Sequence, residues 1–461
     1  MQLANAKRTP LWWHDLDLTG RRDPLPGHID ADVAVVGGGF TGLWAAYYLA
    51  GLQPDLKIVV LERQYVGYGA SGRNGGWCHA AYPLGLTMAA KDYGREGGVR
   101  FERALNDAVA EVGRIATAES IDCHYQKGGR ILVARNPLHL ERAREEAEEY
   151  RSFGFSEDDM RFLDADEASE MIGADGVLGG TFSQHAASLQ PAALARGLAE
   201  ACERRGVQVC EGTTVTGYEP GSVRTDRGTV KARFVIRATE AYTPQFGGVR
   251  RMIAPLYSHM IATEPLSAET WRELGLADRP TFADYSPSLI YGQRTHDDRL
   301  AFGGRGAPYH WRSGVADEFD VNNAVHLDLV RVLKDFFPAL DGVAVTHRWG
   351  GPLGVSRDWR PSVTFSPKSG IGYAGGYVGE GVAASNLAGR TLADLILERD
   401  TELTGLGWVN HTWPNWEPEP LRYVGINAGL WLAKSADREE KRTGKDSWLG
   451  GVGNWLRGKR G

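Results

Sequence analysis

Residues 32–63 constrain the fold of this chain more than any other part of it. An apolar run typical of a β-strand, residues 33–36, leads into Gly37-Gly38-Gly39-Phe40-Thr41-Gly42 and then into an apolar run of helical length, residues 43–52. A second β-type run, residues 58–61, ends at Glu62. The order of strand, glycine turn, helix, strand and acid predicts a βαβ unit that binds an adenine dinucleotide.

Each part of this motif has a physical role in the prediction. Gly37 allows the tight turn, Gly39 lets a pyrophosphate approach the backbone, and Gly42 lets the helix pack closely on the strand. The helix N-terminus at Phe40 and Thr41 offers free N–H groups and a partial positive charge. Glu62 lies 20 residues beyond Gly42, where an acid accepts the ribose hydroxyls, and Arg63 follows it.

Two alternatives to a dinucleotide site remain for this motif. One is a packing turn without a ligand. The other is a membrane span, because residues 33–52 carry no charge. Four glycines in the first half of that segment argue against one continuous spanning helix.

Composition indicates an ordinary globular protein. The 461 residues suffice for about two or three domains, and 42% hydrophobic with 24% charged residues is typical of a soluble chain. A net charge of -6 argues against nucleic-acid binding by the chain as a whole. The four cysteines show no C-x-x-C and no metal spacing, so we expect reduced thiols, no metal site and a cytoplasmic protein. No secretory signal is visible.

The rest of the chain alternates helical and strand patterns. Helices are predicted over 97–119, 137–152, 191–205 and 383–397, the second of them highly charged and expected to be solvated. Residues 250–345 are rich in β-type and aromatic positions and predict a sheet with a binding face. Trp12 and Trp13 are expected to cover the first helix. The basic tail from 435, with Trp448 and Trp455, is expected to be disordered, with contact to a membrane surface or partner as the alternative.

Two further glycine-rich segments belong to the predicted site. Gly69-Ala70-Ser71-Gly72-Arg73-Asn74-Gly75-Gly76 follows the second strand and must be a loop near the cofactor. Residues 371–382 again read as a strand, a glycine turn and a helix N-terminus. The alternatives are a mobile surface loop for the first segment and an ordinary tight turn for the second.

These blocks together resemble the FAD-dependent oxidoreductases of the D-amino-acid oxidase superfamily. The nearest likeness within it is to the glycine and sarcosine oxidase-like amine oxidases, a group that includes gamma-glutamylputrescine oxidase. The likeness is carried by residues 32–62, by Ser71 to Gly76, by 213–215 with Ala238-Thr239, and by 375–382.

The resemblance implies an α/β fold, α+β overall. A Rossmann-like FAD-binding domain would consist of 1–120, 186–245 and 345–404. An inserted substrate domain, built on a mixed or antiparallel sheet, would consist of 121–185 and 246–344. Residues 405–461 would form a C-terminal extension whose end is disordered.

The resemblance also implies the cofactor contacts. Ala70 and the loop from Ser71 to Gly76 would run along the flavin and ribityl chain, and the Val215 backbone would contact the adenine side, with plain β core as the alternative for Val215. Gly379, Gly381 and Val382 would place N–H groups at the flavin pyrimidine edge. Every cysteine lies before residue 211, so a flavin link to a cysteine in the second half is excluded and non-covalent FAD is expected. Attachment at Cys78 or His79 is the alternative.

The reaction implied by the family is oxidation of the C–N bond of a primary or secondary amine. Hydride passes from the α-carbon of the neutral amine to flavin N5. The imine is hydrolysed to an aldehyde or keto acid, and oxygen is reduced to hydrogen peroxide. A flavin dehydrogenase that passes electrons to a carrier or quinone, and a non-catalytic subunit stabilised by flavin, are the competing readings. The oligomeric state stays open.

The candidate substrate residues are weaker predictions. Arg294 is suited to a bidentate grip on a substrate carboxylate, with a surface arginine as the alternative. His259 and His79 are candidates to face the amine and the flavin, although a core histidine is the favoured reading of His259. Tyr257, Tyr291 and Trp349 could form an aromatic wall or pack in the core. Glu380, inside the glycine turn, is expected to point away from the flavin or to face a cationic amine.

Overall fold

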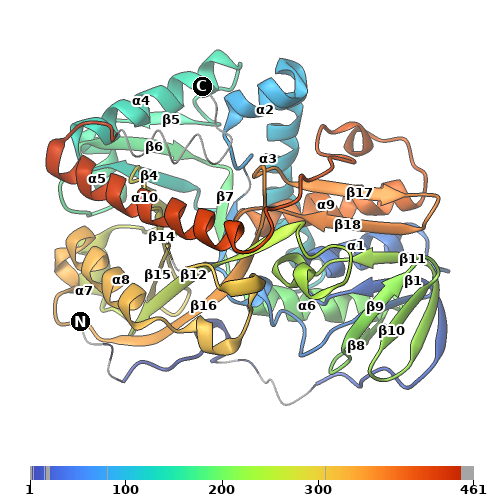
Figure 1. The fold of residues 1–461 in the computed structure, drawn as a ribbon. Helices are drawn as coiled ribbons and strands as arrows, with labels where there is room; N and C mark the ends of the chain where they lie inside the picture. The colour runs from blue at the N-terminus through green and yellow to red at the C-terminus, as the bar shows by residue number, and fades with distance from the viewer. Residues whose placement is uncertain are drawn as a thin grey trace.

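Two eight-stranded sheets form the molecule, and they lie on opposite sides of Figure 1. The computed structural model describes residues 3–447 apart from 4, 15, 17–20, 80 and 307. Trp448 and Trp455, and with them the expected disorder of the chain end, lie outside the described residues.

The first sheet contains the βαβ unit. Its strands run β17-β18-β11-β1-β2-β8, of which β18, β11, β1, β2 and β8 are mutually parallel, and β10 and β9 extend it from β11. The bounds are β17 (Ser362–Ser366), β18 (Ile371–Gly375), β11 (Thr229–Arg237), β1 (Ile29–Val36), β2 (Ile58–Leu61), β8 (Gln208–Cys210), β10 (Ser222–Thr225) and β9 (Val215–Glu219).

The central strands of this sheet are buried on both faces. Along β1, Val33 and Val35 face the helices, whereas Ala34 and Val36 pack with Val223 of β10 on the other side. A strand covered on both faces reads as a continuous apolar run rather than an alternating one. The burial of β1 on both faces explains why the uncharged run of residues 33–52 already begins in the strand.

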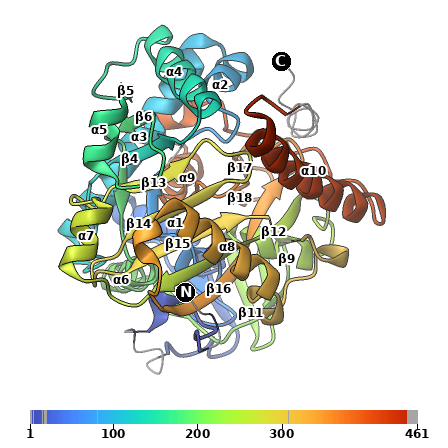
Figure 2. The ribbon, with the colours of Figure 1, turned by 90° about the vertical axis from the view of Figure 1, so that its left-hand side faces the viewer.

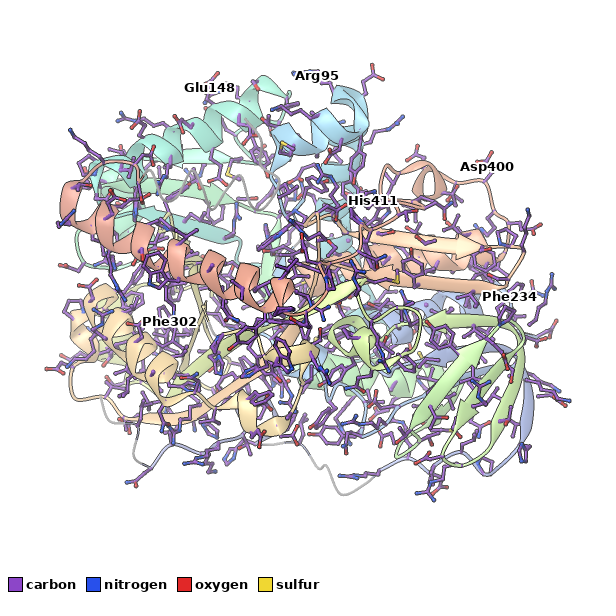
Figure 3. The ribbon with its side chains drawn as sticks, viewed as in Figure 1. Arg95, Glu148, Phe234, Phe302, Asp400 and His411 are labelled. Atoms are coloured by element: carbon purple, nitrogen blue, oxygen red, sulfur yellow. The ribbon has the colours of Figure 1, made fainter. Side chains whose placement is uncertain are left out.

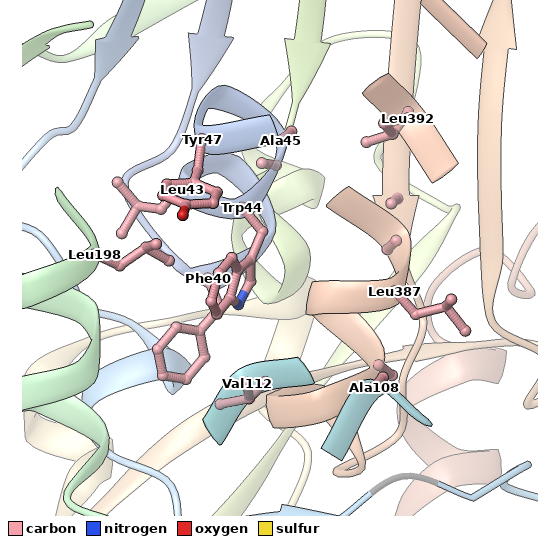
Figure 4. Close-up of a cluster of buried hydrophobic side chains, with 14 of the residues drawn as sticks. Phe40, Leu43, Trp44, Ala45, Tyr47, Ala108, Val112, Leu198, Leu387 and Leu392 are labelled. Atoms are coloured by element: carbon pink, nitrogen blue, oxygen red, sulfur yellow. The ribbon is translucent and has the colours of Figure 1, made fainter. Parts of the chain in front are cut away.

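Helix α1 (Phe40–Leu52) forms the centre of the largest core. Figure 4 shows Phe40, Leu43 and Trp44 among side chains from the helices that surround α1, including Leu198, Val112 and Leu387. These come from α6 (Pro191–Arg204), α3 (Arg95–Ala118) and α9 (Gly381–Ile396). Among the described residues, no helix has both the length and the apolar character needed to cross a bilayer.

The second sheet is mixed, as expected. Its order is β16-β12-β15-β14-β13-β4-β6-β5, and within it only the β13–β4 pair is parallel. The bounds are β16 (Val345–Ser356), β12 (Ile253–Thr263), β15 (Leu300–Arg305), β14 (Ile290–Arg294), β13 (Thr281–Asp284), β4 (Arg130–Ala134), β6 (Gly179–Ser183) and β5 (Arg161–Leu163). A small ribbon of β3 (Trp77–His79) and β7 (Ala186–Ser188) pairs separately from both sheets.

Most of the remaining helices cover the second sheet and its edges (Figure 2). They are α4 (Pro137–Ser152), α5 (Ala165–Met171), α7 (Ala268–Leu274), α8 (Asn323–Phe336) and α10 (Leu421–Thr443). Helix α2 (Leu86–Tyr93) instead packs with α3 in the core around α1. The predicted helices are confirmed within a few residues. The charged face of α4 is solvated, and Glu148 points outward in Figure 3, as Arg95 and Asp400 do. Phe302 lies in the buried face of the second sheet.

Three expectations differ from the structure. Residues 345–356 form β16, which pairs with β12 in the second sheet, although we assigned the chain from 345 onward to the cofactor domain. The predicted domain limits otherwise stay a prediction. Residues 435–443, expected to be disordered, are the end of α10. Trp12 and Trp13 do not cover α1: the Trp12 ring packs against Trp349, and Trp13 stacks on Tyr68.

A buried acid in α3 predicts a pH-dependent stability. Glu102 is 3% exposed and accepts a 2.7 Å hydrogen bond from the Tyr150 hydroxyl, and burial raises the pKa of Glu102 from 4.5 to about 7. The folded carboxyl therefore holds its proton more tightly than the unfolded one, so the free energy of unfolding falls as pH rises from about 4.5 to 7. Glu102→Gln has no carboxyl group to titrate and should not lose stability in this way. The difference in the free energy of unfolding between Glu102→Gln and the parent should therefore rise by about 2–3 kcal/mol from pH 4.5 to 7, as measured by urea titrations. A difference that stays constant with pH would contradict the assignment.

Candidate functional site

A large cavity opens where the glycine turns of the first sheet meet the edge of the second. It measures about 1270 Å³, including space open to solvent. Of the predicted cofactor residues, those that line it are Gly37, Gly39, Phe40, Thr41, Glu62, Arg63, Ala70, Ser71, Asn74, Val215, Ala238, Thr239, Gly379, Gly381 and Val382.

The turn before α1 has the geometry predicted for it. Gly37 has φ +109°, and its N–H donates to the Leu61 carbonyl at 2.9 Å. A Cβ on Gly42 would overlap the carbonyl oxygen of Gly37 and lie 2.9 Å from the Val35 side chain. A Cβ on Gly39 would meet the Ser71 hydroxyl at 3.0 Å. Gly37 and Gly42 are therefore required by the protein itself, and Gly39 brings its backbone to the cavity wall.

Glu62 closes one end of this turn. Its Oε2 accepts the Gly38 N–H at 2.8 Å and its Oε1 accepts the Gln64 N–H at 2.9 Å. Burial raises the pKa of Glu62, and the two backbone donors oppose that shift. A carboxylate has about four acceptor sites, so both oxygens retain capacity for donors in the cavity.

The loop from Ser71 to Gly76 is held by the second sheet and by the N-terminal segment that contains Trp12. Its carbonyls accept hydrogen bonds from three side chains: Trp12 Nε1 to Asn74 at 2.6 Å, Trp349 Nε1 to Arg73 at 2.8 Å and Gln293 Nε2 to Gly75 at 2.8 Å. A Cβ on Gly76 would overlap the Gln293 amide. The glycines of this loop thus permit close packing between the two halves of the molecule.

Arg73 is the charged residue of this loop, and it is buried. Its guanidinium pairs with Asp320 of the short helix η5 (Asp317–Asp320) and donates to the Tyr68 carbonyl at 2.7 Å. It also lies over the Trp13 ring, 4.8 Å from the centroid. Of the other predicted cofactor residues, Arg73 and Gly75 line the smaller cavity described below, and Gly72, Gly76, Gly38 and Gly42 line neither cavity.

A second glycine turn faces the same cavity. Val378 has φ +54° and Gly379 has φ +104°, and α9 begins at Gly381 without a side-chain cap. A non-glycine residue at positive φ is strained, and such strain gathers at functional turns. Helices α1 and α9 therefore both begin at the cavity, and the partial positive charges of their N-termini favour an anionic ligand there.

A smaller cavity of about 680 Å³, again counted with space open to solvent, adjoins the large one. The two share Ala70, Asn74, Leu353, Gly379 and Val382 as lining residues. The rest of the small cavity is formed by Arg73, Gly75, Trp77, Ser258, Met260, Leu289, Tyr291, Gly351 and Glu380. Residues of the second sheet thus face the glycine turns of the first across this space.

Strand alternation explains which substrate candidates reach the small cavity. Tyr291 lines it and shares a 2.7 Å hydrogen bond with the Ser258 hydroxyl. Neighbouring residues on a strand point to opposite faces, so His259 lies on the far side from Ser258. It is 1% exposed, its Nε2 pairs with the Phe319 carbonyl at 3.1 Å, and burial lowers its pKa to about 3. The core-histidine reading therefore fits.

Arg294 and Trp349 also line neither of the two cavities. Three residues beyond Tyr291, Arg294 points to the opposite face of β14, pairs with Asp298 at 2.6 Å and lies over the Trp271 ring. Trp349 is fully buried behind Arg73 and positions the loop. The structure offers no support for Arg294 as a carboxylate grip.

Sequence reasoning missed several lining residues. Ser258 and Met260 are the neighbours of His259, the histidine that we selected. Their strand pairs with the glycine-rich β15, and the alternation of side chains along such a pair could have identified them. Glu240 lines the large cavity beside Gly354; its Oε1 accepts the Gly376 N–H at 3.2 Å, and burial raises its pKa to about 8. Within the described residues, no group of three or more His, Cys, Asp or Glu side chains is arranged to hold a metal ion.

Comparison with known proteins gives a consistent result. The family model for FAD dependent oxidoreductases matches residues 32–395. Gamma-glutamylputrescine oxidoreductase of Escherichia coli is 33% identical over 386 residues, which cover 81% of this chain and 85% of that protein.

Two solved structures share the fold. Glycine oxidase from Geobacillus kaustophilus superposes with a TM-score of 0.67 at 22% identity, over 83% of this chain and 99% of that one. L-proline dehydrogenase from P. horikoshii superposes with a TM-score of 0.67 at 18% identity, over 82% and 96%. At these identities the likeness concerns the fold alone.

Proposed function

The chain belongs to the family of FAD-dependent oxidoreductases, and we propose that it oxidises the C–N bond of a primary or secondary amine. The observation that carries this proposal is the pair of adjoining cavities. One is lined by dinucleotide-binding elements, and the other presents an acid, two hydroxyls and aromatic rings to the shared wall.

The residues present fit FAD in the large cavity. The α1 N-terminus would hold the diphosphate, Glu62 the ribose hydroxyls, and the Val215 backbone the adenine side. The α9 N-terminus, at Gly381 and Val382, would face the flavin. Two observations support this fit: the N-terminus of α9 has no side-chain cap, and Gly39, at the start of α1, lines the cavity. When bound, FAD supplies the acceptor for the hydride that leaves the amine's α-carbon.

The residues of the small cavity would then orient the amine. Trp77 and Tyr291 meet edge to face at 5.8 Å and form one wall, and the Tyr291–Ser258 hydroxyl pair provides a donor and an acceptor. Met260, Leu289 and Leu353 keep the remaining wall apolar and restrict water. Orientation of the reacting carbon is worth large factors in rate. The products would be an aldehyde or keto acid together with ammonia or an amine.

We further propose that FAD is bound non-covalently. All four cysteines are free and buried, and none of them is among the described lining residues. His79 is 7% exposed and its Nδ1 is engaged by Glu380. Buried free thiols also fit the reducing cytoplasm in which we place the protein. Acid precipitation should release intact FAD into the supernatant, and pigment retained on the polypeptide would contradict this.

Glu62→Ala tests the cofactor assignment. One charge-assisted hydrogen bond is worth about 1.5–3 kcal/mol, so loss of the carboxylate should weaken FAD binding by at least about 10- to 100-fold. FAD content after dialysis is the measurement. Asp55→Ala is the matched control, because Asp55 is an exposed acid of the same βαβ unit. Full FAD occupancy in Glu62→Ala would argue against the assignment.

The amine reaction and the electron acceptor are tested together. Holoenzyme is mixed anaerobically with a panel of primary and secondary amines, and bleaching of the flavin absorption identifies substrates. Air is then admitted. We expect rapid reoxidation with stoichiometric hydrogen peroxide. Slow reoxidation that an artificial electron acceptor accelerates would indicate a dehydrogenase, and absence of bleaching with every amine would overturn the proposal.

A further inference from the structure

Helix α10 leaves apolar side chains uncovered on the outside of the molecule (Figures 1 and 2). Leu421 and Trp431 are each 64% exposed, and Val424 is 61% exposed. The Trp311 ring, 50% exposed, meets the Tyr423 ring edge to face at 5.6 Å and extends the same patch. An exposed apolar patch of this kind marks a surface that contacts a protein or a membrane.

The inward face of α10 is fixed to the rest of the protein. Ile426 is buried, and Glu440 accepts a 2.9 Å hydrogen bond from the Arg142 guanidinium of α4. Asp437 pairs with Lys441 of the same helix at 3.6 Å. Two acids of α10 are therefore engaged within the molecule, and the helix presents its other face to the outside in one orientation.

The outward face of α10 changes from apolar to cationic along the helix. Residues seven positions apart lie two turns apart and almost in line. Two neighbouring rows at this spacing begin with apolar residues and end at an arginine: Val424, Trp431 and Arg438, and Leu421, Ala428, Ser435 and Arg442. Both arginines are exposed. The third acid of the helix, Glu439, accepts a hydrogen bond from the Ser447 hydroxyl.

Positive charge is concentrated in this part of the chain. Residues 421–461 contain nine Lys and Arg against four Asp and Glu, whereas the whole chain has a net charge of -6. A basic end on an otherwise acidic chain favours an anionic partner. Tryptophan and tyrosine prefer the boundary between lipid and water, and arginine binds phosphate groups through two hydrogen bonds. An anionic lipid surface offers both environments.

A second copy of α10 fits this face less well. If two helices paired antiparallel about Trp431, Arg438 of each copy would lie on Val424 of the other, because both residues are seven positions from Trp431. Each arginine would then lose water without gaining an acid. Parallel pairing would place arginine against arginine. Lipid phosphates instead supply the missing negative charge.

We propose that the outward face of α10 docks on an anionic membrane surface, where the apolar parts of the two rows enter the headgroup boundary and Arg438 and Arg442 bind lipid phosphates. The helix lies on the membrane and does not cross it, since charged residues occupy its second half. The inference does not depend on amine oxidation, because binding to a lipid surface is measured without turnover.

The test is flotation of holoenzyme with lipid vesicles. One set of vesicles contains phosphatidylcholine alone, and in the other set one quarter of the lipid is phosphatidylglycerol. The parent should float with the anionic vesicles, bind the neutral ones at least about tenfold more weakly, and be released from the anionic ones as salt is raised. Equal binding to both sets, or no binding to the anionic vesicles, would overturn the inference.

Charge variants test the arginines of the two rows. Arg438→Gln with Arg442→Gln should weaken binding to anionic vesicles by about 25-fold, since each basic residue at such a surface contributes about fivefold. Arg227→Gln with Lys231→Gln makes the same change in net charge at exposed residues of the first sheet, and affinity should stay within about twofold. Equal losses in the two double variants would mean that net charge acts in place of α10, against the proposal.

An apolar variant tests the other half of the face. Trp431→Ser should weaken binding by about tenfold or more, because a large apolar side chain no longer leaves water. Leu52→Ser changes an exposed apolar residue of α1, 38% exposed, and should bind as the parent does. FAD content and melting temperature, recorded for each variant, show that the fold is intact.

Two outcomes would assign the face to another occupant. Removal of residues 448–461 should leave vesicle binding that still depends on Trp431. Complete loss of binding in that truncated protein, with normal binding by Trp431→Ser, would transfer the membrane contact from α10 to the chain end. A dimer in sedimentation velocity that Trp431→Ser dissociates, without vesicle binding by the parent, would identify a second copy as the occupant. Either result overturns the proposal.

Discussion

Gly42→Ala is expected to yield protein that does not retain FAD and is less stable by about 1–3 kcal/mol. The added methyl group would overlap the Gly37 carbonyl oxygen and lie 2.9 Å from the Val35 side chain. Both neighbours belong to the β1 strand and its turn, so α1 must move as a unit. Its N-terminus would then leave the cavity wall. FAD occupancy and thermal unfolding measure the two effects.

Gly51→Ala is the matched control, because it makes the same chemical change in the same helix. Nothing lies within 4 Å of a Cβ at Gly51. Alanine has the higher helix propensity, so this variant should be as stable as the parent or up to about 1 kcal/mol more stable. Normal FAD content in Gly42→Ala would show that the close contact between helix and turn is not required.

Arg73→Met is expected to cost about 3–5 kcal/mol of folding free energy, the range measured when one partner of a buried ion pair is removed. Asp320 is 8% exposed and would lose the guanidinium, whose charge opposes the rise that burial causes in the Asp320 pKa. The hydrogen bond to the Tyr68 carbonyl and the contact with the Trp13 ring would also be lost. Urea unfolding of the holoenzyme, with the m-value checked for two-state behaviour, gives the difference.

The double variant Arg73→Met with Asp320→Leu distinguishes the effect of the lost ion pair from the effect of the other contacts that Arg73 makes in the loop. Replacing both charges by apolar groups leaves no buried charge without a partner, so most of the lost stability should return. If the double variant is as unstable as Arg73→Met, the loss comes from the contacts of Arg73 with Tyr68 and Trp13. If Arg73→Met alone lost less than about 1 kcal/mol of folding free energy, solvent would have to screen the Arg73–Asp320 ion pair.

The βαβ unit illustrates how far sequence reasoning reaches. Its elements are contiguous, its glycines have steric causes within a few residues, and its acid lies at a fixed spacing, so the strand, turn and helix of residues 32–63 were predicted in place, while their cofactor contacts stay a prediction. Helices such as α3 and α6 followed from apolar periodicity in the same way. The family resemblance added the order of the two domains, although β16 joined the second sheet.

The substrate side shows where such reasoning ends. His259 and Arg294 were chosen for their chemistry, and each is displaced by an odd number of residues from a residue that lines the cavity, Ser258 and Tyr291 respectively. A shift of one residue along a strand reverses the face, and the sequence of a strand buried on both faces does not show which face meets the cofactor half.

By itself, the sequence determined the glycine turn before α1 and the second glycine turn with its helix, because these depend on local sterics and on patterns within single elements. The fold class followed from the family resemblance that these motifs carry. Only the tertiary structure decided that Trp12, Trp349 and Gln293 hold the loop from Ser71 to Gly76. It also decided that His79 meets Glu380 across 301 residues of chain. Such contacts join segments that are far apart in the chain, and no local propensity encodes which side chains the packing of those segments brings together.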